Sequence, residues 1–197
     1  MSKVKNIDGT PHFPVVSLFS GAMGLDIGLM QAGLNIAVSQ DYDKWCVETI
    51  KKNGHVGVLG DIRELINQDP SCDFLLKAGG LKKDSVFAVV GGPPCQSFST
   101  AGKRLGVEDE RGQLYNQFIH VVDQLRPRFF VMENVKGLAS TLVDPADKQS
   151  LPLLDHILEK FKALGYHTVH GVLDAVHYGT PQFRERLVII GSRDKEA

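Results

Sequence analysis

The residue of this sequence best suited to covalent chemistry is Cys95, in the stretch VVGGPPCQSFS. An apolar run ends there at two glycines and two prolines, and the prolines fix the backbone that carries the thiol. Glu133 follows the next strand-like run, so we expect the two side chains to face one pocket. A thiolate beside a carboxyl group suggests covalent attack assisted by proton donation. The alternatives are a buried, inert cysteine and a Cys–His hydrolase, with His120, His170 or His177 as its base.

A second group of candidate residues surrounds the Gly-rich turn FSGAMGLDIG. Gly21 and Gly24 would let backbone N–H groups approach a ligand at a helix N-terminus. Asp41 follows the second strand-like run, where a carboxylate can accept hydrogen bonds from ribose hydroxyls. Tyr42 could stack on a purine, and Asp61 could accept from an adenine amino group. A nucleoside-containing cofactor therefore fits, whereas the alternative is that Asp43 and Asp61 only cap helices.

These residues need a scaffold, and strand-like and helix-like segments alternate along the chain. The alternation predicts an α/β fold with a doubly wound, mostly parallel sheet, to which a C-terminal hairpin adds an antiparallel strand. Ligands bind beyond the carboxyl ends of strands in such a sheet, which is where the candidate residues stand. Strands are predicted at 15–19, 35–40, 55–60, 85–92, 128–134, 167–173 and 186–192, and helices at 24–32, 44–53, 62–67, 111–126 and 153–164.

Helical spacing also predicts which faces pack inward. Asp43 is the predicted N-cap of the second helix, and a polar connection that contains Gly and Lys is predicted to follow the third helix. The inward faces are predicted to be Leu25, Gly28, Leu29 and Ala32 in the first helix, and Trp45, Cys46, Thr49 and Ile50 in the second.

Composition bounds the function further. A chain of 197 residues is enough for one domain, and we expect 1–197 to form a single domain. The three cysteines form no CxxC pair, which argues against a disulfide framework and a structural zinc site, so neither a metal nor export from the cell is expected. No apolar run is long enough to span a membrane. A formal net charge of −1 is low for a protein that grips nucleic acid with its own surface alone.

Taken together, the motifs resemble those of the C5-cytosine-specific DNA methyltransferases. The resemblance runs from about residue 15 to 193 through LFSGAMGLDIGL, SQDYDKW, GDI, GGPPCQSFS, RGQLY, PRFFVMENVKGL and YGTPQFRERLVIIGSR. It implies a Rossmann-like fold that uses S-adenosylmethionine, leaves S-adenosylhomocysteine and methylates carbon 5 of a flipped-out cytosine in DNA. Such enzymes often belong to restriction-modification systems, and an intracellular location follows.

The resemblance also implies residue roles. Cys95 would add to C6 of the cytosine, Glu133 would hold the base at N3 and its amine, and Arg184 and Arg186 would reach the base oxygen and neighbouring phosphates. The segment after Cys95 would be a mobile loop that closes on DNA. The implied cofactor-binding residues are Phe19, Ser20, Gly21, Gly24, Asp41, Tyr42, Asp61, Ile62, Pro94 and Leu114. The implied substrate-binding residues are Gln96, Ser99, Lys103, Arg104, Asn134 and Gln182.

Family members carry a target-recognition domain and a final helix beyond the last matching motif, and neither is expected within residues 1–197. The chain would then be a fragment, one subunit of a two-chain enzyme, or a truncated form that binds cofactor but is inactive without a partner. Weak activity alone and an exposed apolar patch are expected. A transfer RNA cytosine is the alternative substrate.

Overall fold

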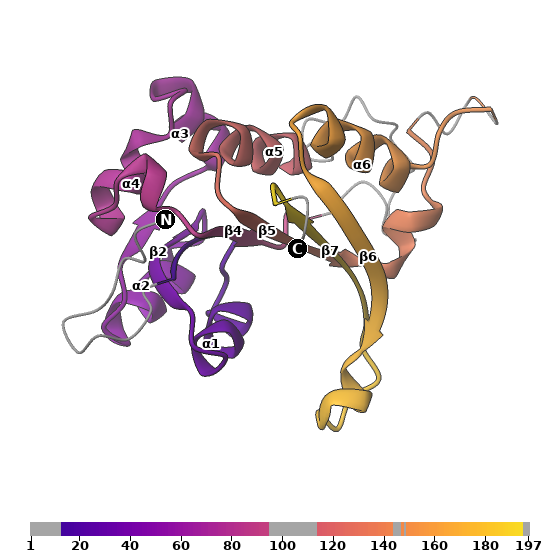
Figure 1. Ribbon diagram of the computed structural model, residues 1–197. Helices are drawn as coiled ribbons and strands as arrows, with labels where there is room; N and C mark the ends of the chain where they lie inside the picture. Colours follow the sequence, from indigo (N-terminus) through magenta and orange to yellow (C-terminus); the bar gives the residue numbers. More distant parts are fainter. Residues whose placement is uncertain (1–12, 95–113, 144–146, 148, 195–197) are drawn as a thin grey trace. The chain divides into compact units, whose positions relative to one another are not determined.

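The computed structural model describes residues 13–94, 114–143, 147 and 149–194. Seven strands form one sheet in the order β3-β2-β1-β4-β5-β7-β6, and helices separate the first five strands along the chain. The predicted α/β class, with a mostly parallel sheet and an antiparallel C-terminal hairpin, is confirmed (Figure 1). The strands are β1 Pro14–Leu18, β2 Asn35–Asp41, β3 Gly57–Leu59, β4 Ala88–Gly91, β5 Phe129–Val135, β6 His167–Asp174 and β7 Glu185–Ser192.

Six α-helices and three 310 turns connect these strands in the described part of the chain. They are α1 Gly24–Gln31, α2 Lys44–Lys52, α3 Ile62–Gln68, α4 Asp73–Gly79, α5 Leu114–Leu125 and α6 Leu153–Ala163, with η1 Lys83–Ser85, η4 Lys136–Ser140 and η5 Ala175–Tyr178. The chain divides into two compact units, each described by itself below. The first unit comprises Met1–Gly91 and His120–Phe130, and the second comprises Gly92–Ile119 and Val131–Ala197.

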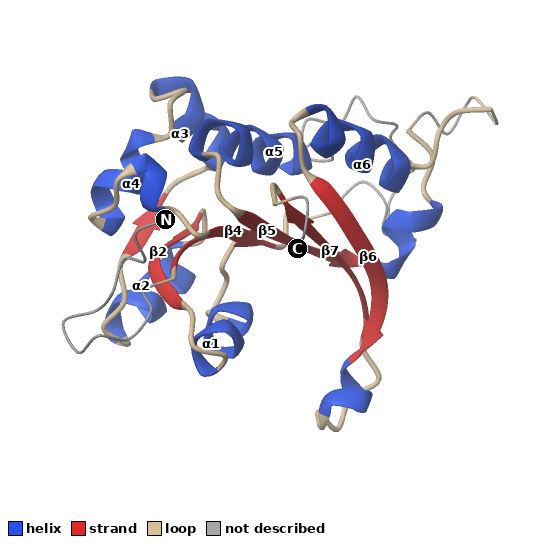
Figure 2. Cartoon of the chain, in the orientation of Figure 1, coloured by secondary structure: helices blue, strands red, loops and turns tan. Residues whose placement is uncertain are grey.

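The first unit is built on parallel strands. β1 pairs with β2 on one side and β4 on the other, and β2 pairs with β3, all in parallel. Every residue of β1 and β4 is buried, as expected of strands covered on both faces. Helices α1 and α2 lie on one face of these strands, and α3 and α4 lie on the other (Figure 2). The carboxyl ends of β1, β2 and β3 therefore open onto the loops that carry the cofactor candidates.

The predicted inward face of α1 is wrong, and that of α2 is wrong except for Ile50, which is buried. In α1, Leu25 is 38% exposed, and the residue that is buried is Asp26. In α2, Trp45 is 71% exposed, whereas the core contacts come from Val47 and Ile50. The spacing of apolar residues gave the wrong faces because apolar residues of both helices remain at the surface. In α1, a carboxyl group lies in the interior instead.

The polar connection predicted after the third helix contains a further helix, α4, that the sequence did not reveal. Helix α4 buries Leu75 and Leu76. It lies between Cys72 and Gly80, which flank it and are both in the left-handed conformation. Its seven residues are too few for a helical period to stand out among the polar neighbours.

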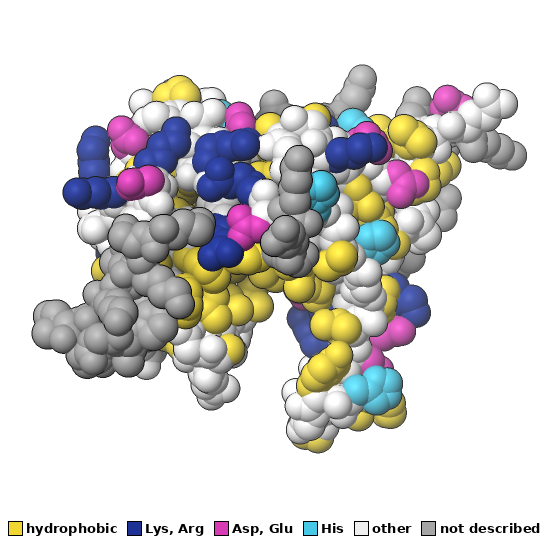
Figure 3. All heavy atoms as spheres, viewed as in Figure 1, with side chains coloured by type: hydrophobic (Ala, Val, Ile, Leu, Met, Phe, Trp, Pro, Cys, Tyr) yellow, Lys and Arg dark blue, Asp and Glu magenta, His cyan; other side chains and the backbone are white. Residues whose placement is uncertain are grey.

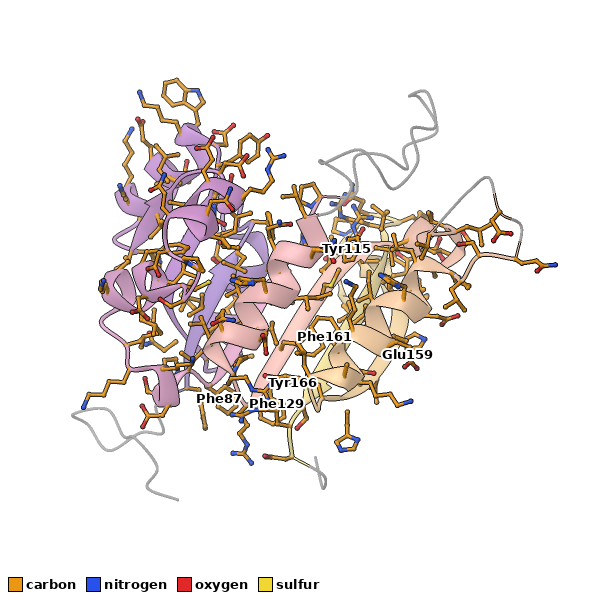
Figure 4. The ribbon with its side chains drawn as sticks, turned by 90° about the horizontal axis from the view of Figure 1, so that it is seen from above. Phe87, Tyr115, Phe129, Glu159, Phe161 and Tyr166 are labelled. Atoms are coloured by element: carbon orange, nitrogen blue, oxygen red, sulfur yellow. The ribbon has the colours of Figure 1, made fainter. Side chains whose placement is uncertain are left out.

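The second unit combines α6 with the β6–β7 hairpin. The two strands pair antiparallel over eight residue pairs, from His167 opposite Ser192 to Asp174 opposite Glu185. Helix α6 buries Leu153, Leu154, Ile157 and Phe161, and Phe161 packs edge-on against Tyr166 with ring centroids 6.4 Å apart (Figure 4).

The far end of the hairpin is apolar but exposed. Tyr178 in η5 is 70% exposed and Phe183 is 87% exposed. Figure 3 shows hydrophobic side chains at the surface of this end of the hairpin. In the described residues, no helix has both the length and the apolar character needed to cross a membrane.

Candidate active site

In the second unit, the predicted site residues Glu133 and Arg186 form an ion pair. Glu133 lies near the end of β5 and Arg186 near the start of β7. Arg186 donates from Nε to Oε1 of Glu133 over 2.8 Å, and the two side chains are 24% and 33% exposed respectively. The pair therefore stands at the surface of the unit with one side sheltered, where a bound molecule could reach the carboxylate.

The strand-end segment before Cys95 approaches this pair closely. A Cβ placed on Gly92 would lie 3.0 Å from Oε2 of Glu133, so a side chain there would require the carboxylate to shift by a few tenths of an ångström. Asn134, which is buried, donates from Nδ2 to the carbonyl oxygen of Pro93 over 2.9 Å. This bond ties the end of β5 to the backbone that leads into Cys95. This contact of Asn134 is structural, and its substrate-binding role stays a prediction.

The other predicted residues of the second unit are more exposed. The side chains of Gln182 and Arg184 are exposed. The backbone around Arg184 is fixed, because its N–H donates to Oδ1 of Asp174 over 2.8 Å and its carbonyl accepts from Ala175. Lys136 of η4 bonds Glu185 over 2.8 Å and so joins the segment after β5 to the start of β7.

Five of the predicted site residues lie outside the described residues. These are Cys95, Gln96, Ser99, Lys103 and Arg104. The expected proximity of Cys95 and Glu133 therefore stays a prediction.

In the first unit, Asp41 organises the predicted cofactor loops. Its carboxylate is almost fully buried and accepts from the backbone N–H of Gly21 over 2.8 Å and from that of Asp43 over 2.9 Å. It thereby holds the loops after β1 and β2 together. A carboxylate has about four acceptor positions, so these two bonds leave capacity for ligand hydroxyls.

The loop after β1 has an unusual backbone. Phe19, Gly21 and Met23 all have positive φ, of 54°, 53° and 69°. The N–H of Ser20 donates to the carbonyl of Gln40 over 3.1 Å, which fixes the loop to the end of β2. Gly24 opens α1 with nothing within 4 Å of a Cβ placed on it, so the predicted close approach of a ligand is sterically open.

The predicted contacts for a purine differ in exposure. Tyr42 is 67% exposed, as a stacking surface requires. Asp61 caps α3 by accepting from the N–H of Arg63, and its carboxylate also pairs with the Arg63 side chain. These side-chain bonds lower the pKa of Asp61. Ile62 is buried, and Pro94 and Leu114, both of the second unit, are half-buried.

Sequence reasoning missed a buried polar cluster in the first unit. Asp26 is fully buried and accepts from Ser17 Oγ over 2.6 Å and from Ser39 Oγ over 2.8 Å. Ser17 Oγ also lies 2.8 Å from Ser20 Oγ in the loop after β1. The available signal was a serine next to apolar residues in each of two strands, with an acidic residue in the first turn of the helix between them.

A metal site is not indicated by the described residues, among which no group of three or more His, Cys, Asp or Glu side chains could hold an ion.

Comparisons with known proteins give a consistent result. The sequence model of a family described as C-5 cytosine-specific DNA methylase matches residues 13–197. Type II methyltransferase M.AquIA of Picosynechococcus sp. is 40% identical to this chain, over 91% of the chain and 71% of that protein. Type II methyltransferase M.NgoFVII of Neisseria gonorrhoeae is 37% identical, over 97% of this chain and 47% of that protein. The chain thus spans about half the length of several curated relatives.

Solved structures agree on the fold. A crystal structure of a putative DNA modification methyltransferase encoded within an E. coli prophage superposes with a TM-score of 0.68 at 26% identity, over 91% of this chain and 46% of that one. The crystal structure of the S. pombe Dnmt2 methyltransferase superposes with a TM-score of 0.66 at 20% identity, a level that speaks for the fold alone.

Proposed function

Because this chain belongs to the family of C-5 cytosine-specific DNA methylases, we propose that it transfers a methyl group from S-adenosylmethionine to carbon 5 of cytosine in DNA, inside the cell. The observation that carries this proposal is the contact between Arg186 and Glu133. It supplies a carboxylate held by a cation beside the Gly92–Pro94 segment that leads into Cys95.

The loops of the first unit fit the cofactor. S-adenosylmethionine, when bound, would supply a methyl group on a positively charged sulfur. Asp41 has acceptor capacity for ribose hydroxyls, and Tyr42 has an exposed face for adenine. The N–H groups at the start of α1 would meet the methionine part, and Asp61 with Ile62 would border the adenine edge.

The side chains of the second unit fit the chemistry at the base. Cytosine C5 is a poor nucleophile because the ring is aromatic. The thiolate of Cys95 would add to C6 and form an S–C bond, while Glu133 would accept from the exocyclic amine and donate a proton to N3, which takes up the electron pair moved into the ring and returns the proton when Cys95 leaves. C5 then takes the methyl group. Loss of the C5 proton to a base restores the double bond, and the S–C6 bond breaks to return the thiolate.

Base flipping is part of this proposal. The target carbon is not accessible in a stacked duplex, so the cytosine must leave the helix at a cost of a few kcal/mol. Arg184 is exposed and stands near Arg186 in sequence, in keeping with a role in holding the flipped nucleotide at its base oxygen and adjacent phosphates. Gln182, Asn134 and the residues after Cys95 would support this grip.

We propose that recognition of a DNA sequence requires protein segments beyond residues 1–197. The chain covers 47% of M.NgoFVII and 71% of M.AquIA, and its formal net charge is −1. A second polypeptide segment, in the same chain or in a partner, would then supply the basic DNA-reading surface.

Labelled methyl transfer tests the proposal. The chain, alone and with a partner segment taken from a relative, is incubated with labelled S-adenosylmethionine and either unmethylated duplex DNA or transfer RNA. Label is expected at C5 of cytosine in DNA, and Cys95→Ser is expected to abolish it. Label found in transfer RNA alone would replace DNA as the substrate, and failure of the chain to bind S-adenosylmethionine would reject the methyltransferase assignment.

A further inference from the structure

A buried polar cluster under the loop after β1 carries an inference that rests on the proposed function and deepens it. The cluster links Asp26 of α1 through Ser17 of β1 to Ser20 of the loop, and we call these three residues the serine relay. The Ser17 hydroxyl lies 2.6 Å from Oδ1 of Asp26 and 2.8 Å from the Ser20 hydroxyl. Ser39 of β2 bonds the other carboxylate oxygen of Asp26 over 2.8 Å, so both oxygens are engaged.

The number of protons in the serine relay sets its direction. A serine hydroxyl has one proton to donate and two lone pairs to accept with. Ser17 donates its proton to Asp26, so the bond between the two serines must be donated by Ser20. The Ser20 proton is therefore directed inward, and its lone pairs are left for a group on the outer side of the loop.

We infer that Asp26 and Ser17 are positioning residues that fix the Ser20 hydroxyl as an acceptor for the protonated amino group of the methionine part of the cofactor. Ser20 is half-buried, while Ser17 and Asp26 are fully buried, so the relay runs from the interior to the surface. It begins at a carboxylate, and hydrogen-bonded chains polarise their members. A relay of this polarity favours a cationic donor over a neutral donor.

The relay needs Asp26 in its ionised form, and the net effect of its surroundings is a raised pKa. Burial raises the pKa of Asp26, but the bonds from Ser17 and Ser39 and the nearby charge of His55 oppose this rise. Within the described cluster, the hydroxyl groups of Ser17 and Ser39 are the donors that stabilise the carboxyl group of Asp26 inside the first unit. A carboxylate that accepts from both serines satisfies every polar atom of the cluster.

Ligand pairs test the inference directly. S-adenosylhomocysteine carries the amino group, and 5′-methylthioadenosine shares the adenosyl thioether but lacks the amino acid part. Ser20→Ala is expected to weaken S-adenosylhomocysteine about tenfold, as the loss of a charge-assisted bond predicts, and to leave 5′-methylthioadenosine unchanged. Ser20→Thr keeps the hydroxyl and is expected to restore affinity. Ser71→Ala is the matched control, since Ser71 also donates to an aspartate, Asp69, but lies outside the cluster.

A double-mutant cycle separates the relay from a structural role. Ser17→Ala frees the Ser20 hydroxyl to rotate and is expected to weaken S-adenosylhomocysteine about threefold, and the double variant Ser17→Ala/Ser20→Ala should bind no worse than Ser20→Ala alone. If Ser17→Ala does not fold, Asp26→Asn tests the same coupling, because it replaces the carboxylate that accepts from Ser17. Calorimetric titration and thermal unfolding are measured on every variant.

The outcomes are distinct. Additive losses in the cycle, or equal losses for both ligands in Ser20→Ala, would overturn the inference and leave the proposed function in place. Unchanged binding of both ligands by Ser20→Ala would do the same. Wild-type protein that binds neither ligand would overturn the proposed function together with the inference.

Discussion

At the residue scale, the position of Glu133 depends on the lack of a side chain at Gly92. A Cβ there would lie 3.0 Å from Oε2 of Glu133, closer than nearly all such contacts. We expect Gly92→Ala to displace the carboxylate and to lower the rate of methyl transfer about 10- to 100-fold, since small misplacements of a catalytic group have effects of this size. Binding of S-adenosylhomocysteine should not change.

Single-turnover methyl transfer and calorimetry measure the two effects. Gly137→Ala is the control, because nothing lies within 4 Å of a Cβ placed on Gly137. An unchanged rate for Gly92→Ala would show that the carboxylate has room to move and that its position is not fixed from this side.

A second residue-scale prediction concerns the partner of Glu133. Arg186→Lys keeps the charge but loses the Nε donor that reaches Oε1 over 2.8 Å. We expect the rate constant of transfer to fall at least tenfold, with little change in cofactor affinity. A variant whose loss lies entirely in cofactor affinity would place Arg186 outside the chemistry at the base.

At the scale of the element, the caps of α2 and α3 are local features that the sequence revealed. Asp43 accepts from the N–H groups of Trp45 and Cys46. We expect Asp43→Ala to lower the free energy of unfolding by about 1 kcal/mol, as typical for the loss of an N-cap. Urea titration measures it, and an unchanged midpoint would mean that α2 is held by packing alone.

The cap of α3 gives a pH prediction. The pKa of Asp61 is lowered from its ordinary value of 3.8, chiefly by side-chain hydrogen bonds from Arg63. Because the folded-state pKa is the lower one, the pair stabilises the protein fully above pH 3.8 and loses this effect as the pH falls through the folded-state value. The difference in unfolding free energy between wild type and Arg63→Gln should therefore shrink below about pH 4. A difference that is constant with pH would contradict it.

Capping and strand burial were predictable because they depend on neighbours in sequence. The N-caps Asp43 and Asp61 and the fully buried β4 follow from short patterns. The inward face of α1 did not, because Asp26 is buried only where two serines on different strands meet it. That meeting is a property of the sheet order, and no window of sequence along α1 contains it.

At the scale of the whole molecule, the family motifs revealed the class of reaction. They did not reveal whether these residues are sufficient to carry it out. The chain covers about half of M.NgoFVII. We expect residues 1–197 alone to methylate DNA weakly or not at all, and activity to appear when a segment that reads DNA is supplied. Methyl transfer at increasing concentrations of such a segment measures this. Robust transfer by the purified chain alone would contradict it.

The exposed hairpin has a consequence for handling the protein. β6 ends the sheet order, and its Val169 is 67% exposed. An outermost strand with apolar side chains is a template on which another copy can add its own strand. Concentrated samples should therefore grow into oligomers by edge-to-edge strand addition, and a lysine at position 169, as in Val169→Lys, should slow that growth in light-scattering experiments.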